Sequence, residues 1–305
     1  MGGTLFPMIK NHSFSLVVSG LFLSLAPAFA STATVPANGL LMEITGHIYP
    51  KDSLPLNCKG ILQGVKCEAS AYGRYHLEAK KEGELIYNYV TFSGPEGDQV
   101  IEQSWEKNGK VKKAIIENRA IGKRSQLEVK NGIAYYEVTD LNDRSVKKSE
   151  DNAEDNLVVP STMLTYVKAN AERIAKGETV QIKMAVLDRR DSFTFNVHKI
   201  KDDKSADGEA IQVLEMTPAS FLVKAAVDPM YFYVKPKNSE LFAFEGESGL
   251  RKKIGNTFEK MKVRTSYDYR YYGTIATEQQ ASKKSDCDTA AMITGKTAVK
   301  CEVKQ

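Results

Sequence analysis

Two asparagine–glycine pairs, each placed between stretches in which apolar and polar residues alternate, constrain the fold of this chain more than any other feature. The pairs and the stretches that they separate are Asn108-Gly109 between residues 99–107 and 111–118, and Asn131-Gly132 between residues 125–130 and 133–139. Both residues of a two-residue hairpin turn need positive φ angles, which asparagine and glycine adopt readily. The pattern therefore predicts two hairpins of an antiparallel meander.

Similar short stretches recur along most of the chain. They are residues 84–92, 178–187, 192–200, 210–216, 230–235, 241–245 and 260–269, with turns at residues 188–191 and 236–239. The stretches follow no repeat of fixed period. They predict a mainly β fold, a strongly curved antiparallel sheet or half-barrel of about twelve strands.

Residues 161–176 replace the alternation with helical spacing. The apolar side chains at this spacing are Met163, Leu164, Val167, Ala171 and Ile174. We expect Ser161 to cap the helix and Gly177 to end it in a left-handed conformation. A curved antiparallel sheet has to bury its apolar face, so one amphipathic helix is expected to close the concave side. The acidic residues 150–156 are interpreted as a loop before this helix, because they lack the ligand spacing of an EF-hand calcium site.

The first thirty residues have the pattern of a secretory signal peptide. Lys10 precedes an apolar run at residues 14–25, and residues 28–30 present the small side chains that a signal peptidase accepts. The run is too short to span a bilayer. We therefore expect cleavage near Ala30 and a periplasmic or secreted protein. No cysteine lies near the cleavage point and no later apolar run is long enough for a transmembrane helix, so neither a lipid anchor nor a membrane span is expected in the mature chain.

Three regions follow from these patterns. They are a signal peptide at residues 1–30, an antiparallel half-barrel domain at residues 31–276 and a polar C-terminal tail at residues 277–305. Whether translation starts at Met1 or Met8 is left open.

All four cysteines follow the signal peptide. An even number of cysteines in an exported chain predicts disulfide bonds. The local pairing, Cys58 with Cys67 and Cys287 with Cys301, is favoured because each pair flanks a short polar segment. A pairing that ties the two ends of the chain together remains open. Zinc is not expected, because no C-x-x-C spacing occurs.

Several function classes find no support in the sequence. The net charge of +4 is evenly spread, so nucleic-acid binding is not expected. His47, His76 and His198 are scattered, and no metal site or cofactor is predicted. The chain lacks a P-loop and a dinucleotide fingerprint, and residues 246–249 lack the G-x-S-x-G spacing of a nucleophile elbow. We assign no catalytic residue, and whether the protein is an enzyme stays open.

Residues 230–246 and 248–250 combine an aromatic strand, a lysine-bearing turn, an apolar strand and a glycine-bearing loop. Together with the order of strands and helix, this hairpin resembles exported bacterial half-barrel domains of the lipoprotein-localisation-factor-like superfamily. The resemblance covers residues 40–269 in topology, and it implies an incomplete barrel whose concave apolar face is closed by a helix. Relatives of that shape bind acyl chains or lipoproteins, and the resemblance supplies no catalytic residues. It has no counterpart for residues 51–66 or 282–305.

We expect an apolar wall that lines a ligand site beneath the helix. Its members are Met163, Leu164 and Val167 on the helix, and Tyr231, Tyr233, Phe242 and Phe244 on the aromatic hairpin. Alternation places Tyr231 and Tyr233 on the opposite face from Phe232, and which face is concave stays open. Cross-strand packing is the simpler interpretation of the same aromatic residues.

Three hypotheses of function result. The first is a soluble, non-catalytic periplasmic binding protein for a lipid, an acyl chain or a lipid-modified partner. The second is a structural or protein-interaction module of the cell envelope with a filled core. The third is a hydrolase whose site is assembled from several strands.

Overall fold

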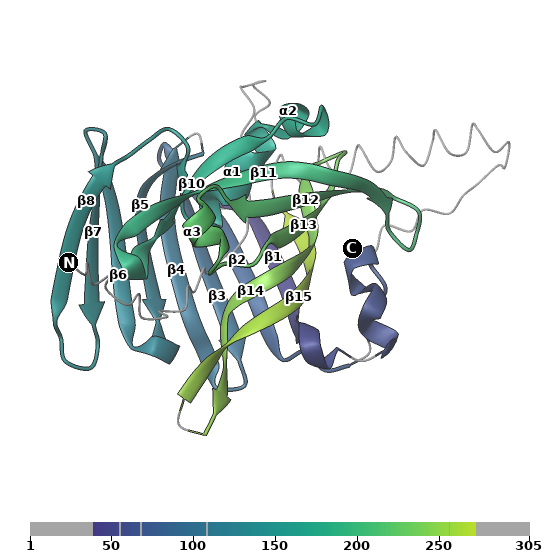
Figure 1. Ribbon diagram of the computed structural model, residues 1–305, viewed down its shortest axis with the longest axis horizontal. Coiled ribbons are helices and arrows are strands. Elements are labelled where there is room, and N and C mark those ends of the chain that lie inside the picture. Colours follow the sequence, from purple (N-terminus) through teal and green to yellow (C-terminus); the bar gives the residue numbers. More distant parts are fainter. Residues whose placement is uncertain (1–38, 55, 68, 108, 256, 273–305) are drawn as a thin grey trace, which may run out of the picture.

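A single, strongly curved sheet forms most of the computed structural model, which describes residues 39–272 apart from residues 55, 68, 108 and 256 (Figure 1). The strands are β1 (Leu40–Pro50), β2 (Gly73–Glu82), β3 (Leu85–Gly94), β4 (Gly97–Lys107), β5 (Lys110–Asn118), β6 (Lys123–Lys130), β7 (Ile133–Asp140), β8 (Val146–Asn152), β9 (Leu157–Val158), β10 (Val180–Val186), β11 (Asp191–Lys204), β12 (Ala210–Pro218), β13 (Met230–Lys235), β14 (Glu240–Ile254) and β15 (Thr257–Tyr271). The prediction of a mainly β half-barrel is confirmed. The described residues contain fifteen strands, however, rather than about twelve.

The helical elements of the described chain are short. They are α1 (Pro160–Ala169), α2 (Ala171–Ala175), α3 (Phe221–Lys224) and the 3-10 turns η1 (Lys51–Ser53), η2 (Leu56–Gln63), η3 (Arg119–Ile121) and η4 (Leu187–Arg189). Among the described residues, no helix has the length and apolar character that a membrane span requires.

Strands β1, β2, β8 and β9 were not among the predicted stretches. The side chains of β8 are polar except for Val146, so the strand offers no hydrophobic alternation to recognise. Strand β9 has only two residues. The expectation of a loop over the whole of residues 150–156 is therefore wrong, because β8 continues to Asn152 by pairing with β7.

The predicted turns have the expected geometry. Asn131 and Gly132 have φ angles of 52° and 77° and join β6 to β7. Gly109 has a φ angle of 75° in the turn between β4 and β5, whereas Asn108 lies outside the described residues. The turns at residues 188–191 and 236–239 likewise join antiparallel neighbours.

Neighbouring strands in the sheet follow one another along the chain, with one exception. Every pair of sheet neighbours is consecutive along the chain except β1 and β15, whose pairing brings the two ends of the described chain together. Strands β8 and β9 form the two edges of the sheet, although only residues 153–156 separate them in the sequence. The sheet thus bends until a four-residue segment connects its edges, and it stays unclosed there.

One end of the half-barrel is covered by the long β14–β15 hairpin. The side chain of Gln99 on β4 accepts a hydrogen bond from the backbone N–H of Arg251 at 2.8 Å and donates to its carbonyl at 3.1 Å. The register of β14 against β15 shifts between Glu247 and Arg251, which lets the hairpin bend across β3 and β4.

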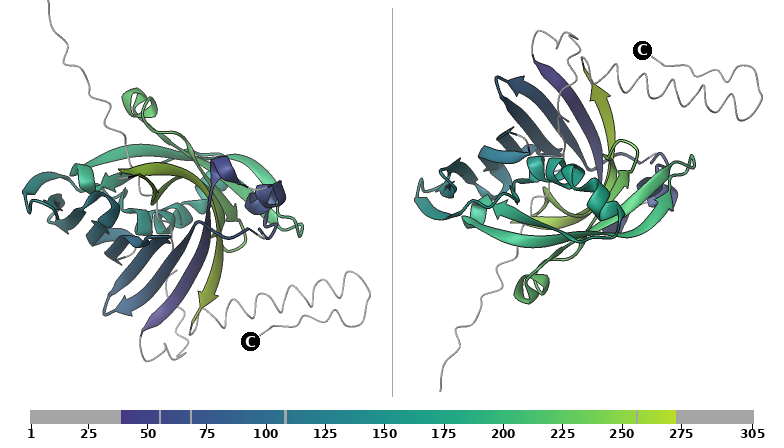
Figure 2. Two further views of the ribbon diagram at one scale, coloured as in Figure 1. Left: turned by 90° about the horizontal axis from the view of Figure 1, so that it is seen from below. Right: turned by 90° about the horizontal axis from the view of Figure 1, so that it is seen from above.

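Helix α1 lies inside the curve of the sheet, as both views of Figure 2 show. It contacts β4, β5, β9 and β10. Met163 and Val167 are buried in the main apolar core together with Ile174 of α2. The expectation that a helix closes the concave face is confirmed.

The predicted helix over residues 161–176 is divided in two and begins one residue earlier. Pro160 is its first residue, and the Thr162 hydroxyl, not that of Ser161, accepts the free N–H of Val159 at 3.1 Å. Asn170 interrupts the helix with φ −109° and ψ 12°. Its side-chain amide donates to the carbonyl of Tyr166 at 2.9 Å, an alternative to helical bonding that asparagine commonly offers.

Residues 51–66, which the resemblance left without a counterpart, cover the outer face of the sheet. Ile61 and Leu62 of η2 pack on Tyr49 and Ala243 in a second, smaller core. The predicted bond between Cys58 and Cys67 is confirmed and links η2 to the segment that follows it, with 4.6 Å between the Cα atoms. Cys287 and Cys301 lie outside the described residues.

Candidate functional site

A small apolar cavity lies between the α1–α2 segment and strands β12 and β13. Its volume is about 150 Å³. The lining residues are Val167, Lys168, Ala171, Glu172, Ile174, Ala175, Gln212, Leu214, Val234, Pro236 and Ser239. An engineered protein cavity of about this size holds a benzene molecule. The space therefore admits the end of an apolar chain, but not a whole lipid.

The cavity also presents charged groups. Lys168 and Glu172 contribute to its lining. Burial lowers the pKa of Lys168, and the neighbouring Glu240 carboxylate opposes this shift. A lysine and a glutamate thus lie beside the apolar wall of the cavity.

The predicted lining residues on the inner face fall into two groups. Val167 lines the cavity itself. Met163 and Phe244 belong to the main core instead, and Phe244 packs against Phe232 with 5.3 Å between ring centres. The side chain of Leu164 lies outside the described part of the structure.

The remaining predicted residues lie on the outer face of the sheet. Tyr233 and Phe242 pack in the second core beneath η2, and Tyr231 shares their face because it is two residues from Tyr233 along β13. The structure does not bring these three rings together with Met163. Phe232 and Phe244 occupy the concave side, which settles the orientation that the sequence left open.

A buried polar cluster beneath α1 was not predicted from the sequence. The Oε1 atom of Glu102 on β4 accepts a hydrogen bond from the backbone N–H of Ser161 at 3.0 Å. The hydroxyl groups of Ser104 and Ser161 are 2.7 Å apart, and Asn88 on β3 donates to Ser104 at 3.3 Å. The helix N-terminus is thus held to the sheet by polar contacts as well as by its apolar face.

Two carboxyl groups of this cluster have strongly raised pKa values. Glu102 and Glu106 are 0% and 1% exposed. Burial raises the pKa of Glu102 to about 7, and hydrogen bonds from Ser161 oppose the shift. Burial raises the pKa of Glu106 to about 8, and the Asn88 and Thr165 side chains oppose that shift.

The cluster can bind and release protons near neutral pH. It gives no indication of ligand or metal binding among the described residues. Neither Glu102 nor Glu106 lines the cavity beside α2. Within residues 39–272 as described, no group of three His, Cys, Asp or Glu side chains is placed to hold a metal ion. The available signal in the sequence was the alternation of Val100, Glu102, Ser104 and Glu106 on one face of β4.

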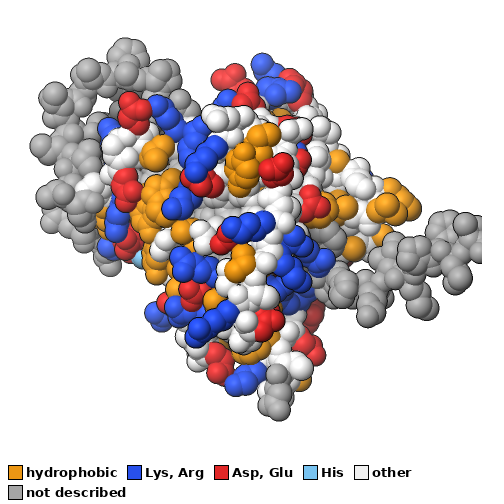
Figure 3. Space-filling view, turned by 90° about the vertical axis from the view of Figure 1, so that its left-hand side faces the viewer, with side chains coloured by type: hydrophobic (Ala, Val, Ile, Leu, Met, Phe, Trp, Pro, Cys, Tyr) orange, Lys and Arg blue, Asp and Glu red, His pale blue; other side chains and the backbone are white. Residues whose placement is uncertain are grey.

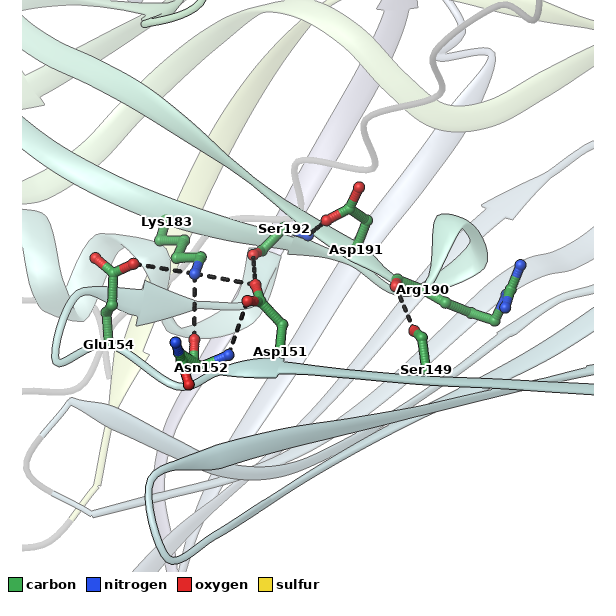
Figure 4. Close-up of polar contacts among 8 residues, drawn as sticks. All are labelled: Ser149, Asp151, Asn152, Glu154, Lys183, Arg190, Asp191 and Ser192. Atoms are coloured by element: carbon green, nitrogen blue, oxygen red, sulfur yellow. Dashed lines mark hydrogen bonds and ion pairs between the residues drawn. The ribbon is translucent and has the colours of Figure 1, made fainter.

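Side chains bridge the open edge of the sheet, as Figure 4 shows. The ammonium group of Lys183 on β10 lies 3.0 Å from Asp151, 3.0 Å from Glu154 and 3.1 Å from the carbonyl oxygen of Asn152. The Ser192 hydroxyl donates to the same Asp151 carboxylate at 2.8 Å. We call this group of contacts the seam, and it links β8 and Glu154 to β10 and β11.

The outer face of β5–β8 carries charges of both signs with hydrophobic side chains between them (Figure 3). A shallow hollow of about 580 Å³ lies on this face. Its lining includes Lys113, Glu128, Tyr135, Glu137 and Lys148. Since Lys148 pairs with Glu137 at 2.8 Å, the hollow has no concentrated charge of one sign.

The fold is an unclosed half-barrel with a helix inside its curve. Comparisons with solved structures find the following proteins. A β-barrel-like protein of domain of unknown function DUF1849 from Brucella abortus is 10% identical, with a TM-score of 0.37 over 77% of this chain and 100% of the other. A LolA superfamily protein from Nitrosomonas europaea is 11% identical, with a TM-score of 0.21 over 77% of this chain and 85% of the other. A domain assigned to outer membrane lipoprotein sorting from Vibrio parahaemolyticus is 10% identical, with a TM-score of 0.25 over 75% and 85%.

These likenesses include the superfamily that the sequence resembles. Their low identities and TM-scores transfer no ligand or site residue to this chain. No family model matches the sequence. No curated protein matches it either.

Proposed function

We propose that this protein is a non-catalytic binding protein of the periplasm or extracellular space, which holds an acyl chain of a lipid or of a lipid-modified partner. The observation that carries the proposal is the apolar cavity between α1–α2 and β12–β13, with Val167, Leu214 and Val234 in its wall. Burial of an acyl chain end there is favourable by about 25 cal/mol for each Å² of apolar surface removed from water.

Two features of the chain support the proposed location. Residues 1–30 have the features of a signal peptide, and the Cys58–Cys67 disulfide suits an oxidising compartment. In a bacterial envelope, a binding protein with this cavity has lipids within reach.

The size of the cavity adds a condition to the proposal. Pockets that enclose a whole small ligand usually measure about 300–1,000 Å³. At about 150 Å³ the present cavity takes only the end of a chain unless α2 moves. The break at Asn170 makes α2 a separate five-residue unit, and we propose that α2, with its buried Ile174, shifts on binding while α1 stays packed on the sheet.

The test is binding of a dansyl-labelled fatty acid, followed by fluorescence, to the wild type and to Ala171→Phe. Ala171 lines the cavity and is only half-buried, so phenylalanine fills the space without placing a charge in the core. Ala169→Phe is the matched control, since Ala169 is exposed on the same segment and does not line the cavity. We expect at least about a tenfold weaker affinity for Ala171→Phe, because the lost burial of a few methylene groups suffices for that change.

Two results would overturn the proposal. One is the absence of probe binding to the wild type together with an unliganded mass in native mass spectrometry. The other is equal affinity of the wild type and Ala171→Phe.

The envelope interaction module remains the second candidate. The observation that favours it is the continuous core from α1 through the sheet, which leaves little free volume. It predicts protein cross-links on the outer face in place of lipid binding.

A further inference from the structure

Two large apolar side chains are almost fully exposed on α3. Phe221 is 82% exposed and Leu222 is 76% exposed, whereas the next most exposed large apolar side chain among the described residues, Val146, is 51% exposed. Single exposed apolar residues are common, but two adjacent ones at such fractions mark an interaction site.

The short helix is held in place by the residues that follow this pair. Val223 packs against the main core and Val227 is buried in it. The backbone N–H groups of Lys224 and Ala219 bond to the carbonyls of Ser220 and Thr194 at 3.0 and 2.8 Å. Helix α3 is thus anchored to the core, while Phe221 and Leu222 remain exposed to solvent. Exposure of this apolar surface to water is unfavourable.

The shape of α3 selects a particular kind of partner. Both views of Figure 2 show it standing out from the outer side of the sheet, so it offers a projection and no groove. An aromatic side chain buries at most about 250 Å². Two side chains therefore cover well under the roughly 800 Å² that each partner of a stable protein complex contributes.

The charges around α3 favour a negatively charged binding partner. Lys224 and Asp228 are the only charged residues of the loop at residues 219–229. Asp228 is neutralised by Lys262 at 2.7 Å. In the described part of the chain no carboxylate pairs with Lys224, so its ammonium group is available to anionic lipid head groups.

We propose that α3 is a membrane-contact tip, which inserts Phe221 and Leu222 into the interfacial region of an anionic lipid bilayer and sets Lys224 among its head groups. Two side chains and one cation give weak, reversible attachment of the kind that a single anchoring signal provides. The tip connects the end of β12 to the start of β13, whereas the cavity is lined by Gln212, Val234 and Pro236 at the other ends of these strands. The tip is thus separate from the cavity and does not depend on what the cavity holds.

The first experiment is co-sedimentation with vesicles of phosphatidylethanolamine and phosphatidylglycerol. The double variant Phe221→Ser/Leu222→Ser is compared with the wild type and with Leu141→Ser/Val146→Ser, which removes two apolar side chains that are 44% and 51% exposed at the β7–β8 turn. All three proteins start at Ser31, after the expected cleavage point, so the apolar run at residues 14–25 does not contribute to vesicle binding and only the substituted sites differ. We expect the partition constant to fall about tenfold or more for the α3 variant and to change less than about twofold for the control.

A second experiment reports on the tip directly. Trp105 is the only tryptophan of the chain, so Trp105→Phe/Phe221→Trp moves the single indole fluorophore to α3. We expect its emission to shift to shorter wavelength on addition of vesicles and to be quenched by brominated acyl chains.

The proposal is overturned by any of three results. They are equal vesicle binding of the wild type and the α3 variant, unquenched emission from the tryptophan on α3, and a dimer of the wild type that the α3 variant dissociates. Fatty-acid binding by the α3 variant in the dansyl assay separates this test from that of the cavity.

Discussion

The buried carboxyl groups of Glu102 and Glu106 have pKa values far above those of exposed glutamates. A carboxylate without a counter-ion is costly to bury, so at pH 7 Glu106 is largely protonated and Glu102 is about half protonated. Their pKa values of about 7 and 8 lie well above the usual value near 4.5. The folded protein therefore binds more protons than the unfolded chain between about pH 4.5 and pH 8.

The free energy of unfolding is expected to fall as pH rises through this window. Below the pKa of a glutamate in the unfolded chain, burying the protonated groups costs no free energy of ionisation. This advantage is lost as pH rises through the pKa values that the two groups have in the folded protein. Glu106→Gln has the shape of the protonated glutamate but cannot ionise. We therefore expect its free energy of unfolding to depend less on pH and to exceed that of the wild type by about 2–4 kcal/mol near pH 9. Urea unfolding at pH 5, 7 and 9 measures this. Glu128→Gln, an exposed change on β6, is the control, and an unchanged slope for Glu106→Gln would contradict the pKa assignment.

Strand alternation predicted which side chains share a face but not which face is inside. Tyr231 and Tyr233 share one face of β13 and Phe232 the other, as the sequence indicates. The inner position of Phe232 depends on the direction in which the whole sheet curves, and the outer rings are covered by η2, which a local pattern does not reveal. Glu102 and Glu106 were missed because a glutamate in a strand is normally assigned to solvent.

At the scale of elements, η2 and its disulfide form an outer layer separate from the main core. The bond closes a short loop, with a sequence separation of 9 between Cys58 and Cys67. For Cys58→Ser/Cys67→Ser we expect a loss of about 2–3 kcal/mol from the free energy of unfolding, measured in urea. Hydrogen exchange should become faster in η2 and stay slow in β3 and β4. Equal loss of protection throughout the sheet would show instead that the second core supports the whole fold.

The Lys183 contacts of the seam are expected to stabilise the edges of the sheet. Methionine has about the length of the aliphatic part of lysine. Lys183→Met therefore keeps the packing but removes the contacts of the ammonium group with Asp151, Glu154 and the Asn152 carbonyl. Because the Lys183 side chain is only 11% exposed, we expect a loss of about 1–2 kcal/mol and faster hydrogen exchange in β8 and β9. Lys148→Met is the control, since the Lys148 side chain is 71% exposed in its pair with Glu137. Unchanged exchange at both edges would contradict a role for the seam.

The elements with a strong local signal were predictable, and those without one were not. The turn at Asn131-Gly132 needed only two residues, and the apolar positions of α1 fall at helical spacing. The break at Asn170 leaves that spacing intact, so the sequence pattern continues across it. The pairing of β1 with β15 joins segments at opposite ends of the domain, and no local turn specifies such a contact.

At the scale of the whole molecule, the half-barrel is open at two different places. The unpaired edges β8 and β9 lie at one place, where the seam links β8 to β10 and β11. The cavity lies at the other, beside α2 and against β12 and β13. The opposite end is covered by the β14–β15 hairpin through Gln99 and Arg251. On our proposal, a ligand that enters beside α2 displaces this five-residue helix and leaves the sheet intact.

The central claim is that an acyl chain occupies the space between α2 and strands β12 and β13. The most direct measurement is a crystal structure of the protein with a bromine-tagged fatty acid, in which anomalous scattering locates the bromine atom. We predict a bromine peak next to Val167, Leu214 and Val234, with α2 shifted away from the sheet. A peak elsewhere on the molecule, or none at a saturating concentration of the fatty acid, would contradict the claim.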